Sequence, residues 1–240
     1  MQDEVAKHTK KIYRAWNNPQ HPVAEKIKEI IVEIFIIVFA VTISIWFHNW
    51  SDHRHEQDEV KEFLRGLKDD LTEDINQLQI NKDSIAHLDS SYYFLFSIQK
   101  NDERSTAIDD GLIYHNLRFD LRVTRPNIGR YEGFKSSGKI GNIENDSLKQ
   151  HILVFYEQTI PHLNYGENFV NSLQTRILDL QVDKSDETSI KNFVASTKIK
   201  DLLSFATQNF KYNINGSDGY NDAIKQAKWI IVEIDKEERK

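Results

Sequence analysis

A predominantly apolar stretch from Ile30 to Trp50 constrains this chain more than any other feature. It contains no Lys or Arg, and Glu33 is its only acidic residue. As an α-helix, its 21 residues measure about 31 Å, close to the ~30 Å hydrocarbon thickness of a bilayer. Trp46 and Trp50 lie at one end, where amphipathic rings favour the headgroup layer. We therefore predict one transmembrane helix with Trp46 and Trp50 as its interfacial anchors.

Two other kinds of segment can be equally apolar. A buried helix of a soluble protein is seldom apolar on every face over this length. A cleaved signal peptide has a shorter apolar core and a cleavage site of small residues. This stretch ends instead in the bulky sequence Trp-Phe-His-Asn-Trp. A membrane span is therefore the preferred interpretation.

The basic residues that flank the stretch indicate its orientation. Those before it are Lys7, Lys10, Lys11, Arg14, Lys26 and Lys28, and those soon after it are Arg54, Lys61, Arg65 and Lys68. Because cytoplasmic flanks carry the excess of Lys and Arg, this small bias places the N-terminus inside. We predict a cytoplasmic tail over residues 1–21, a transmembrane helix over 22–50 and a periplasmic domain over 51–240, in a bacterial inner membrane.

The residues that follow the apolar stretch are mostly polar and are numerous enough for one domain with a core. The composition of the chain limits what kind of domain this is. Cysteine is absent, which excludes disulfides, thiolate catalysis and Cys-ligated metals. The net charge of −6 argues against a nucleic-acid partner bound through phosphate neutralisation. Only 9 Gly and 4 Pro occur among 240 residues, which favours helices over a turn-rich β fold.

An amphipathic stripe follows the membrane stretch, at spacings of three and four: Val60, Leu64, Leu67, Leu71, Ile75 and Leu78. Such spacing is typical of a helix with one apolar face. That face either packs in the core of the domain or forms a homo-oligomeric coiled coil. The spacing does not keep a clean heptad over four repeats, which favours core packing.

Further stripes predict helices to about residue 100 and over residues 128–135, 147–161, 169–180, 199–210 and 220–234. Ser147 and Gln150 have the spacing of a capping box, and Pro161 is expected to kink or end its helix. Residues 101–124 are less regular and predict short helical or irregular pieces. The sum is an all-α fold, in which a single transmembrane helix continues into an antiparallel extracytoplasmic helical bundle.

Two blocks of residues resemble a known family. The first is Val32-Glu33-Ile34 with Asn49-Trp50, and the second is Asn127, Tyr131-Glu132, Lys135-Ser136-Ser137-Gly138, Ile143, Leu148 and Phe155-Tyr156. Over roughly residues 25–235 the chain resembles the domain of unknown function 6090 family of small bacterial membrane proteins. Phe134 stands where that family usually has Leu. The resemblance implies a single-pass inner-membrane protein with a helical outer domain, and it implies no assigned activity.

Glu33 is the first candidate for a functional contact, because an ionised carboxylate in lipid costs a few kcal/mol. Glu29 lies four residues earlier and shares its helix face. Three interpretations stay open. Glu33 reaches the headgroups beside Lys26 or Lys28, it contacts a partner helix, or it belongs to a proton path with Thr42 and Ser44.

Other candidate chemistry is weaker. His48, Asp52 and His55 share a helix face, but a metal site needs three or four converging ligands and a solvated face is more common. The run from Gly133 to Lys139 has phosphate-loop spacing, yet Ile140 replaces the required Ser or Thr and no strand precedes it. A helix end capped by glycine is simpler. We predict no cofactor, metal or catalytic residues.

The predicted function is that of a non-enzymatic, membrane-anchored scaffold or interaction subunit. Its expected partners are the lipid bilayer and either further copies of itself or another membrane protein. Contacts are expected around Glu33 and Glu29 and along the helix from Val60 to Leu78. The alternative is an extracytoplasmic sensor that signals through a partner, because residues 1–21 are too short for an output domain.

Overall fold

The computed structural model describes residues 7, 9–11, 13–14, 23–99, 108–184 and 188–239, without the side chains of residues 23–26 and 29. All regular elements within these ranges are helical. The chain divides into two compact units, Met1–Glu59 and Val60–Lys240, and each is described by itself.

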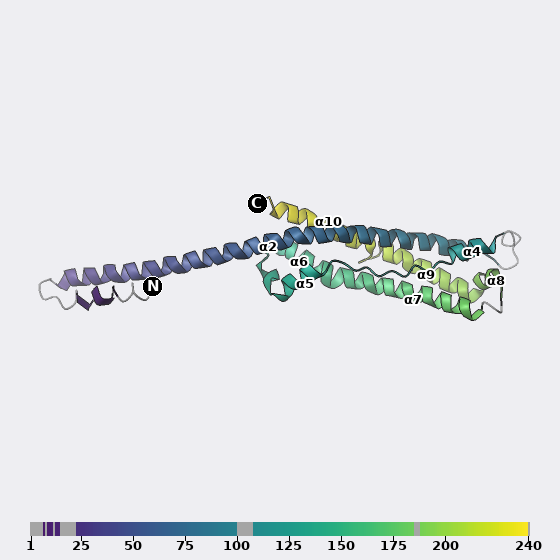
Figure 1. The fold of residues 1–240 in the computed structure, drawn as a ribbon, viewed down its shortest axis with the longest axis horizontal. Helices are drawn as coiled ribbons and strands as arrows, with labels where there is room; N and C mark the ends of the chain where they lie inside the picture. The colour runs from purple at the N-terminus through teal and green to yellow at the C-terminus, as the bar shows by residue number, and fades with distance from the viewer. Residues whose placement is uncertain are drawn as a thin grey trace. The chain divides into compact units, whose positions relative to one another are not determined.

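Helix α2 (Val23–Ser97) contains the apolar stretch (Figure 1). Its sequence has no proline and a single glycine, Gly66. Among the described residues it is the one helix long and apolar enough to cross a membrane, and none of its most apolar window is buried. The prediction of one helix of membrane-spanning length is confirmed.

The second unit is built on three helical rods that lie side by side (Figure 1). The first is the part of α2 that follows Glu59. The second joins α6 (Asp146–Val154), the π-helix η2 (Phe155–Thr159) and α7 (Ile160–Lys184), and the third joins α9 (Thr197–Asn215) and α10 (Tyr220–Glu237). Shorter elements are α4 (Asp110–Asn116), α5 (Gly129–Ser136), the 3-10 helix η1 (Lys139–Asn142) and α8 (Ile190–Val194).

Contacts along α2 and α10 establish that these helices are antiparallel. Arg65 Nε lies 3.4 Å from Glu238 Oε1, just beyond the end of α10, and Lys82 Nζ lies 3.3 Å from Asn221 Oδ1 near its start. Residue numbers therefore rise on α2 as they fall on α10.

The second and third rods also run in opposite directions. Asn213 Nδ2 donates to Gly166 O at 3.3 Å, and the rings of Phe169 and Phe205 meet edge to face at 5.9 Å. The predicted antiparallel helical bundle is confirmed.

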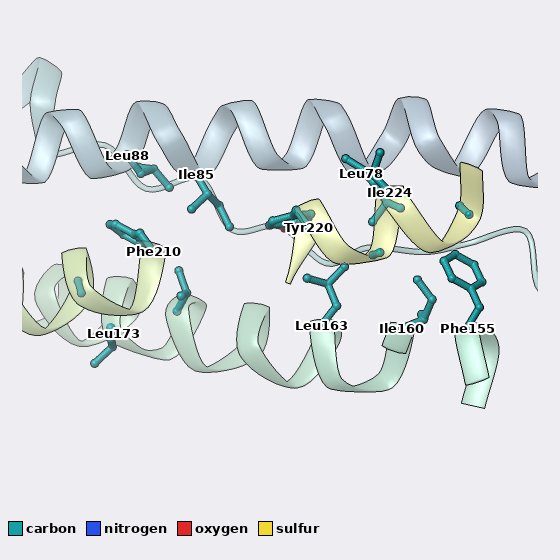
Figure 2. Close-up of a cluster of buried hydrophobic side chains, with 14 of the residues drawn as sticks. Leu78, Ile85, Leu88, Phe155, Ile160, Leu163, Leu173, Phe210, Tyr220 and Ile224 are labelled. Carbon is teal, nitrogen blue, oxygen red and sulfur yellow. The ribbon is translucent and has the colours of Figure 1, made fainter. Parts of the chain in front are cut away.

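The apolar stripes of all three rods meet in one core (Figure 2). Leu78 and Ile85 reach it from α2, Leu163 from α7 and Phe210 from α9, and each is buried. Burial of a side chain of this size contributes about 1.5–3 kcal/mol, so these stripes are the main source of the bundle's stability.

Residues 118–128 form a non-helical segment, which we call the extended segment. They are in neither helix nor strand, and they join α4 to α5 by running back along the bundle. From residue 121 to 127, exposed residues alternate with buried or partly buried ones, as expected of extended chain.

The predicted capping box at Ser147 and Gln150 is wrong. The N-cap of α6 is Asn145, whose side chain accepts a hydrogen bond from the Leu148 N–H at 3.0 Å. The Asn145 amide also donates to Glu237 Oε1 at 2.6 Å. Contact with α10 therefore favours an asparagine cap, which is as good a cap as serine.

Pro161 does not end its helix, because η2 accommodates it. The Ile160 N–H bonds to Phe155 O, five residues back. A proline lacks the N–H for an ordinary helical bond and its ring crowds the carbonyl four residues earlier. The wider π turn before Pro161 relieves that conflict.

The predicted glycine stop is confirmed. Helix α5 ends at Ser136, and Gly138 follows in the left-handed region with φ of 77°. Residues with a Cβ adopt this conformation only at a cost.

Candidate functional site

Glu33 is partly covered by the N-terminal segment. Lys11 Nζ lies 3.8 Å from Glu33 Oε1, and the Glu33 side chain is only 14% exposed. The sequence suggested Lys26 or Lys28 as the screening charge, and the structure adds Lys11; the side chain of Lys26 lies outside the described part of the chain. The side chain of Glu29 lies outside the described part of the chain.

Small residues share a helix face with Glu33. Ile37, Ala40 and Ser44 follow Glu33 at intervals of four, three and four residues, which places all four within one narrow face. Ala40 and Ser44 let another backbone approach closely in a membrane.

The hydroxyl groups of the membrane stretch bond within their own helix. Thr42 Oγ1 donates to Val38 O and Ser44 Oγ donates to Ala40 O, both at 2.8 Å. Both hydroxyl protons are therefore directed to backbone carbonyls of their own helix rather than to Glu33.

The two predicted interfacial anchors belong to an aromatic cluster at the end of the stretch. Phe47 lies edge to face with Trp46 at 5.2 Å and with Trp50 at 6.5 Å. The Arg54 guanidinium lies 4.9 Å from the Trp50 ring centroid, which is a cation–π distance. Trp46 and Trp50 are both exposed, so the part that they play at a membrane surface stays a prediction.

The polar residues that follow form pairs rather than a metal site. His48 Nδ1 lies 3.5 Å from Asp52 Oδ2, and His55 Nε2 lies 4.0 Å from Glu59 Oε1. No group of three potential ligands is positioned to hold a metal ion in the described part of the chain.

The amphipathic stripe lies inside the bundle. Five of its residues are buried in the core, and Ile75 is partly buried against it; the five are Val60, Leu64, Leu67, Leu71 and Leu78. The chain's own helices occupy the face that a homo-oligomeric coiled coil would need. We therefore correct the expectation that this apolar face holds a partner, and only the exposed faces of the helix stay available.

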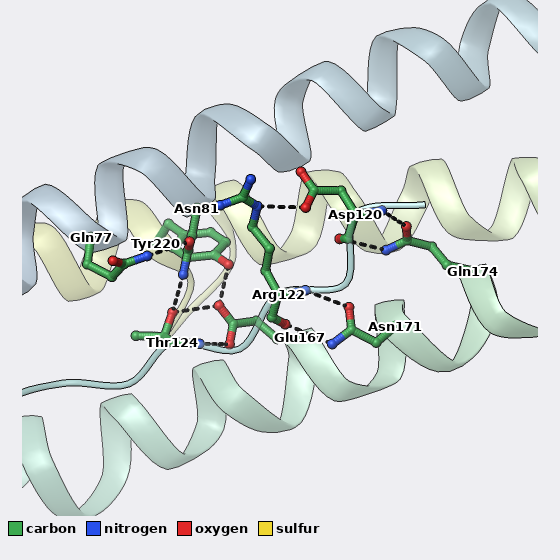
Figure 3. A network of polar contacts seen from close by, with 9 residues as sticks. All are labelled: Gln77, Asn81, Asp120, Arg122, Thr124, Glu167, Asn171, Gln174 and Tyr220. Carbon is green, nitrogen blue, oxygen red and sulfur yellow. Dashed lines mark hydrogen bonds and ion pairs between the residues drawn. The ribbon is translucent and has the colours of Figure 1, made fainter. Parts of the chain in front are cut away.

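Side chains of α7 hydrogen-bond to the extended segment in a ladder (Figure 3). The Asp120 N–H donates to Gln174 Oε1 at 2.9 Å, and Gln174 Nε2 donates back to Asp120 O at 3.4 Å. The Arg122 N–H donates to Asn171 Oδ1 at 3.3 Å, and Asn171 Nδ2 donates to Arg122 O at 2.7 Å. Two amide side chains thus do for this segment what a neighbouring strand does in a sheet.

The ladder ends on a buried carboxylate. Glu167 is 1% exposed and accepts hydrogen bonds from the Thr124 N–H and Oγ1, both at 2.6 Å, and from the Tyr220 hydroxyl (Figure 3). Asn81 Nδ2 donates to Thr124 Oγ1 at 3.0 Å, which connects α2 to the same network. Burial raises the pKa of Glu167, while the bonds from Thr124 and Tyr220 oppose that rise.

This network has a structural role. Its hydrogen bonds join α2, the extended segment, α7 and α10, and Glu167 is closed to solvent. Sequence analysis missed it. The available signal was that Glu167 and Gln174 stand at the core spacing of Leu163, Val170 and Ile177.

A second buried carboxylate lies where α5 and η2 meet α2. Asp74 is 4% exposed, and its Oδ1 accepts the Asn127 N–H at 2.9 Å. Among the described residues, neither Asp74 Oδ2 nor the Tyr156 hydroxyl has a hydrogen-bond partner. Burial raises the pKa of Asp74 to about 6, with smaller contributions from Asp70 and Glu73 and an opposing one from the Asn127 bond.

Tyrosine rings pack beside Asp74. Tyr131 stacks on Tyr156 at 4.4 Å, and its hydroxyl donates to Glu157 Oε1 at 2.6 Å. Lys135 Nζ lies 2.5 Å from the same carboxylate oxygen. Asp74 and Glu157 were not predicted, because their neighbours come from distant parts of the chain.

A polar hollow of about 360 Å³ lies at the turn between α9 and α10. Its lining includes one carboxylate, Asp222, and one ammonium group, Lys225, among residues such as Asn215 and Ser217. It is open to solvent, and Asp222 Oδ2 accepts hydrogen bonds from the Asp218 N–H at 3.4 Å and from Gln226 Nε2 at 3.0 Å.

Comparison with protein families identifies the family of this chain. The model of a family of unknown function, DUF6090, matches residues 33–179. The chain belongs to the DUF6090 family. The DUF6090 match is narrower than the 25–235 expected from sequence, yet it includes Glu33, Asp74, the ladder and most of α7. No curated protein and no solved structure matches the chain.

Proposed function

We propose that this DUF6090 protein is a non-enzymatic, membrane-anchored scaffold or interaction subunit of a homo-oligomer or of a membrane complex. Its N-terminus lies in the bacterial cytoplasm and its helical bundle in the periplasm. The observation that carries the proposal is a contrast in burial. The bundle fills its own core, whereas none of the most apolar window of the membrane helix is covered by the chain.

The face around Glu33 is the contact surface in this proposal. An intramembrane carboxylate is stabilised when it faces a polar partner rather than lipid. Ala40 and Ser44 on the same face permit a second helix to approach closely. Lys11 Nζ, 3.8 Å away, offsets the negative charge of Glu33 without removing the polar character of the face.

The polar groups of the bundle support a non-enzymatic role. Glu167 is sealed in an internal network, and the hollow at the α9–α10 turn offers one carboxylate beside one ammonium group. The first is closed to solvent, and in the second the described hydrogen bonds to Asp222 come from the Asp218 N–H and from Gln226 rather than from a hydroxyl nucleophile.

Substitution of Glu33 tests the proposal. Glu33→Ala is expected to weaken co-purification of the partner or of the oligomer, because the polar contact is lost, while membrane insertion stays normal. Ile31→Ala is the matched control, since Ile31 is exposed on the opposite face of α2. Equal assembly of the wild type and both variants, with equal insertion, would contradict the proposal.

The Asp74 cluster favours a second candidate, an extracytoplasmic sensor that signals through a partner protein. Burial raises the pKa of Asp74 to about 6, and among the described residues neither Asp74 Oδ2 nor the Tyr156 hydroxyl has a hydrogen-bond partner. A thermal-shift series over pH, metals and small molecules distinguishes the two functions. Stabilisation by one ligand favours the sensor, and its absence favours the scaffold.

A further inference from the structure

The N-terminal segment presents a basic face. Its described residues are helical, and Lys7, Lys10, Lys11 and Arg14 recur at intervals of three, one and three residues. Residues at these intervals share one side of a helix. All four side chains are exposed, and no acidic residue occurs between Lys7 and Arg14. We name this set the N-terminal basic face.

The ion pair with Glu33 positions this face beside the membrane helix. Lys11 and Glu33 belong to the same compact unit, and Glu33 lies about one helical turn inside the apolar stretch. The segment that carries Lys11 therefore lies at the boundary between hydrocarbon and headgroups. Tyr13 is 70% exposed there, and a tyrosine ring with its hydroxyl suits that layer.

We propose that the N-terminal basic face binds anionic phospholipid headgroups. Headgroup phosphates complement four clustered cations, and clusters of Lys and Arg next to a membrane helix attract anionic lipids. The Lys11 side chain stays 69% exposed despite its ion pair, so it also reaches the headgroup layer. The whole chain carries a net charge of −6, which opposes attraction of a large polyanion such as nucleic acid and favours a local ligand.

The experiment uses the full-length protein in nanodiscs made from equal amounts of phosphatidylglycerol and phosphatidylcholine. Native mass spectrometry counts the lipids retained on the protein. The wild type is expected to retain phosphatidylglycerol in excess. Substitution of all four cations by Gln removes that excess, because each Lys or Arg at an anionic surface changes the relative affinity by up to about fivefold. Raising the salt concentration weakens the wild-type preference.

Matched variants keep the test specific. The control replaces four exposed lysines of the second unit by Gln: Lys61, Lys198, Lys225 and Lys228. It carries the same change of charge and is expected to retain the wild-type preference. A Lys10→Gln/Arg14→Gln variant preserves the Lys11–Glu33 pair and is expected to lose part of the preference. Replacing the three lysines by Arg is expected to preserve it.

Two results would overturn the proposal: an unchanged lipid preference after removal of the four cations, or an equal loss in the control. The same spectra report the number of polypeptides in each particle. Loss of lipid preference with intact assembly, or the reverse, therefore separates this proposal from the proposed function.

Discussion

Asp74 makes the stability of the bundle depend on pH. Its folded pKa of about 6 exceeds the ordinary value of 3.8, so the folded state binds the proton more tightly. The contribution of Asp74 to stability therefore becomes more favourable as pH falls from 7 through 6 toward 4. We expect Asp74→Asn to stabilise the bundle at pH 7 by about 1–2 kcal/mol, because a neutral amide of the same size removes the cost of burying the charge.

Chemical unfolding of the purified full-length protein at pH 7 and at pH 4.5 measures this effect. The difference between Asp74→Asn and the wild type is expected to shrink at the lower pH, where Asp74 of the wild type is protonated in the folded state. A difference that is the same at both values would show that Asp74 does not titrate in this window.

Glu167 tests the buried network. Glu167→Ala leaves the Thr124 N–H and the Tyr220 hydroxyl without their acceptor and is expected to lower the free energy of unfolding by about 3 kcal/mol. Tyr165→Ala on the same helix is the control. Its side chain is 77% exposed, so it is expected to cost less than about 0.5 kcal/mol. Similar losses in the two variants would count against a structural role for the network.

At the scale of elements, the extended segment depends on α7. We expect Asn171→Leu/Gln174→Leu to release residues 118–125, because the N–H groups of Asp120 and Arg122 lose their acceptors. Hydrogen exchange at these two amides is expected to speed up by about tenfold or more, as loss of a bond of about 1.4 kcal/mol implies. Thr175→Leu on the exposed side of α7 is the control, and exchange at the wild-type rate in the double variant would refute the ladder.

The helices were predictable because their cause is local. Spacings of three and four residues mark the core faces of α2, α7, α9 and α10, and the structure buries those faces. The extended segment was not predictable from its own residues, since its hydrogen-bond partners lie about 50 residues away on α7. The π turn before Pro161 was missed because a kink, a helix end and a π turn all fit the local sequence. The Asn145 cap was missed because its side chain also bonds to Glu237, 92 residues away.

The candidate contact site was only partly accessible to sequence reasoning. Glu33 stands out as the single acid of the membrane stretch, but Lys11 was not foreseen as its neighbour. The stripe from Val60 to Leu78 was correctly weighed toward core packing, and its apolar face is filled by the chain's own helices. Asp74 and Glu167 gave weaker signals, each a carboxylate at a core spacing that only tertiary neighbours explain.

At the scale of the whole molecule, the bundle buries its own core, whereas the chain buries none of the most apolar window of α2. The most direct test is the mass of the intact particle, extracted gently from its native membrane. We expect either a multiple of 28.2 kDa or a particle with a second polypeptide, because the face around Glu33 is held to contact another membrane helix. A lone 28.2 kDa chain, retained under conditions that preserve known membrane complexes, would contradict the central claim.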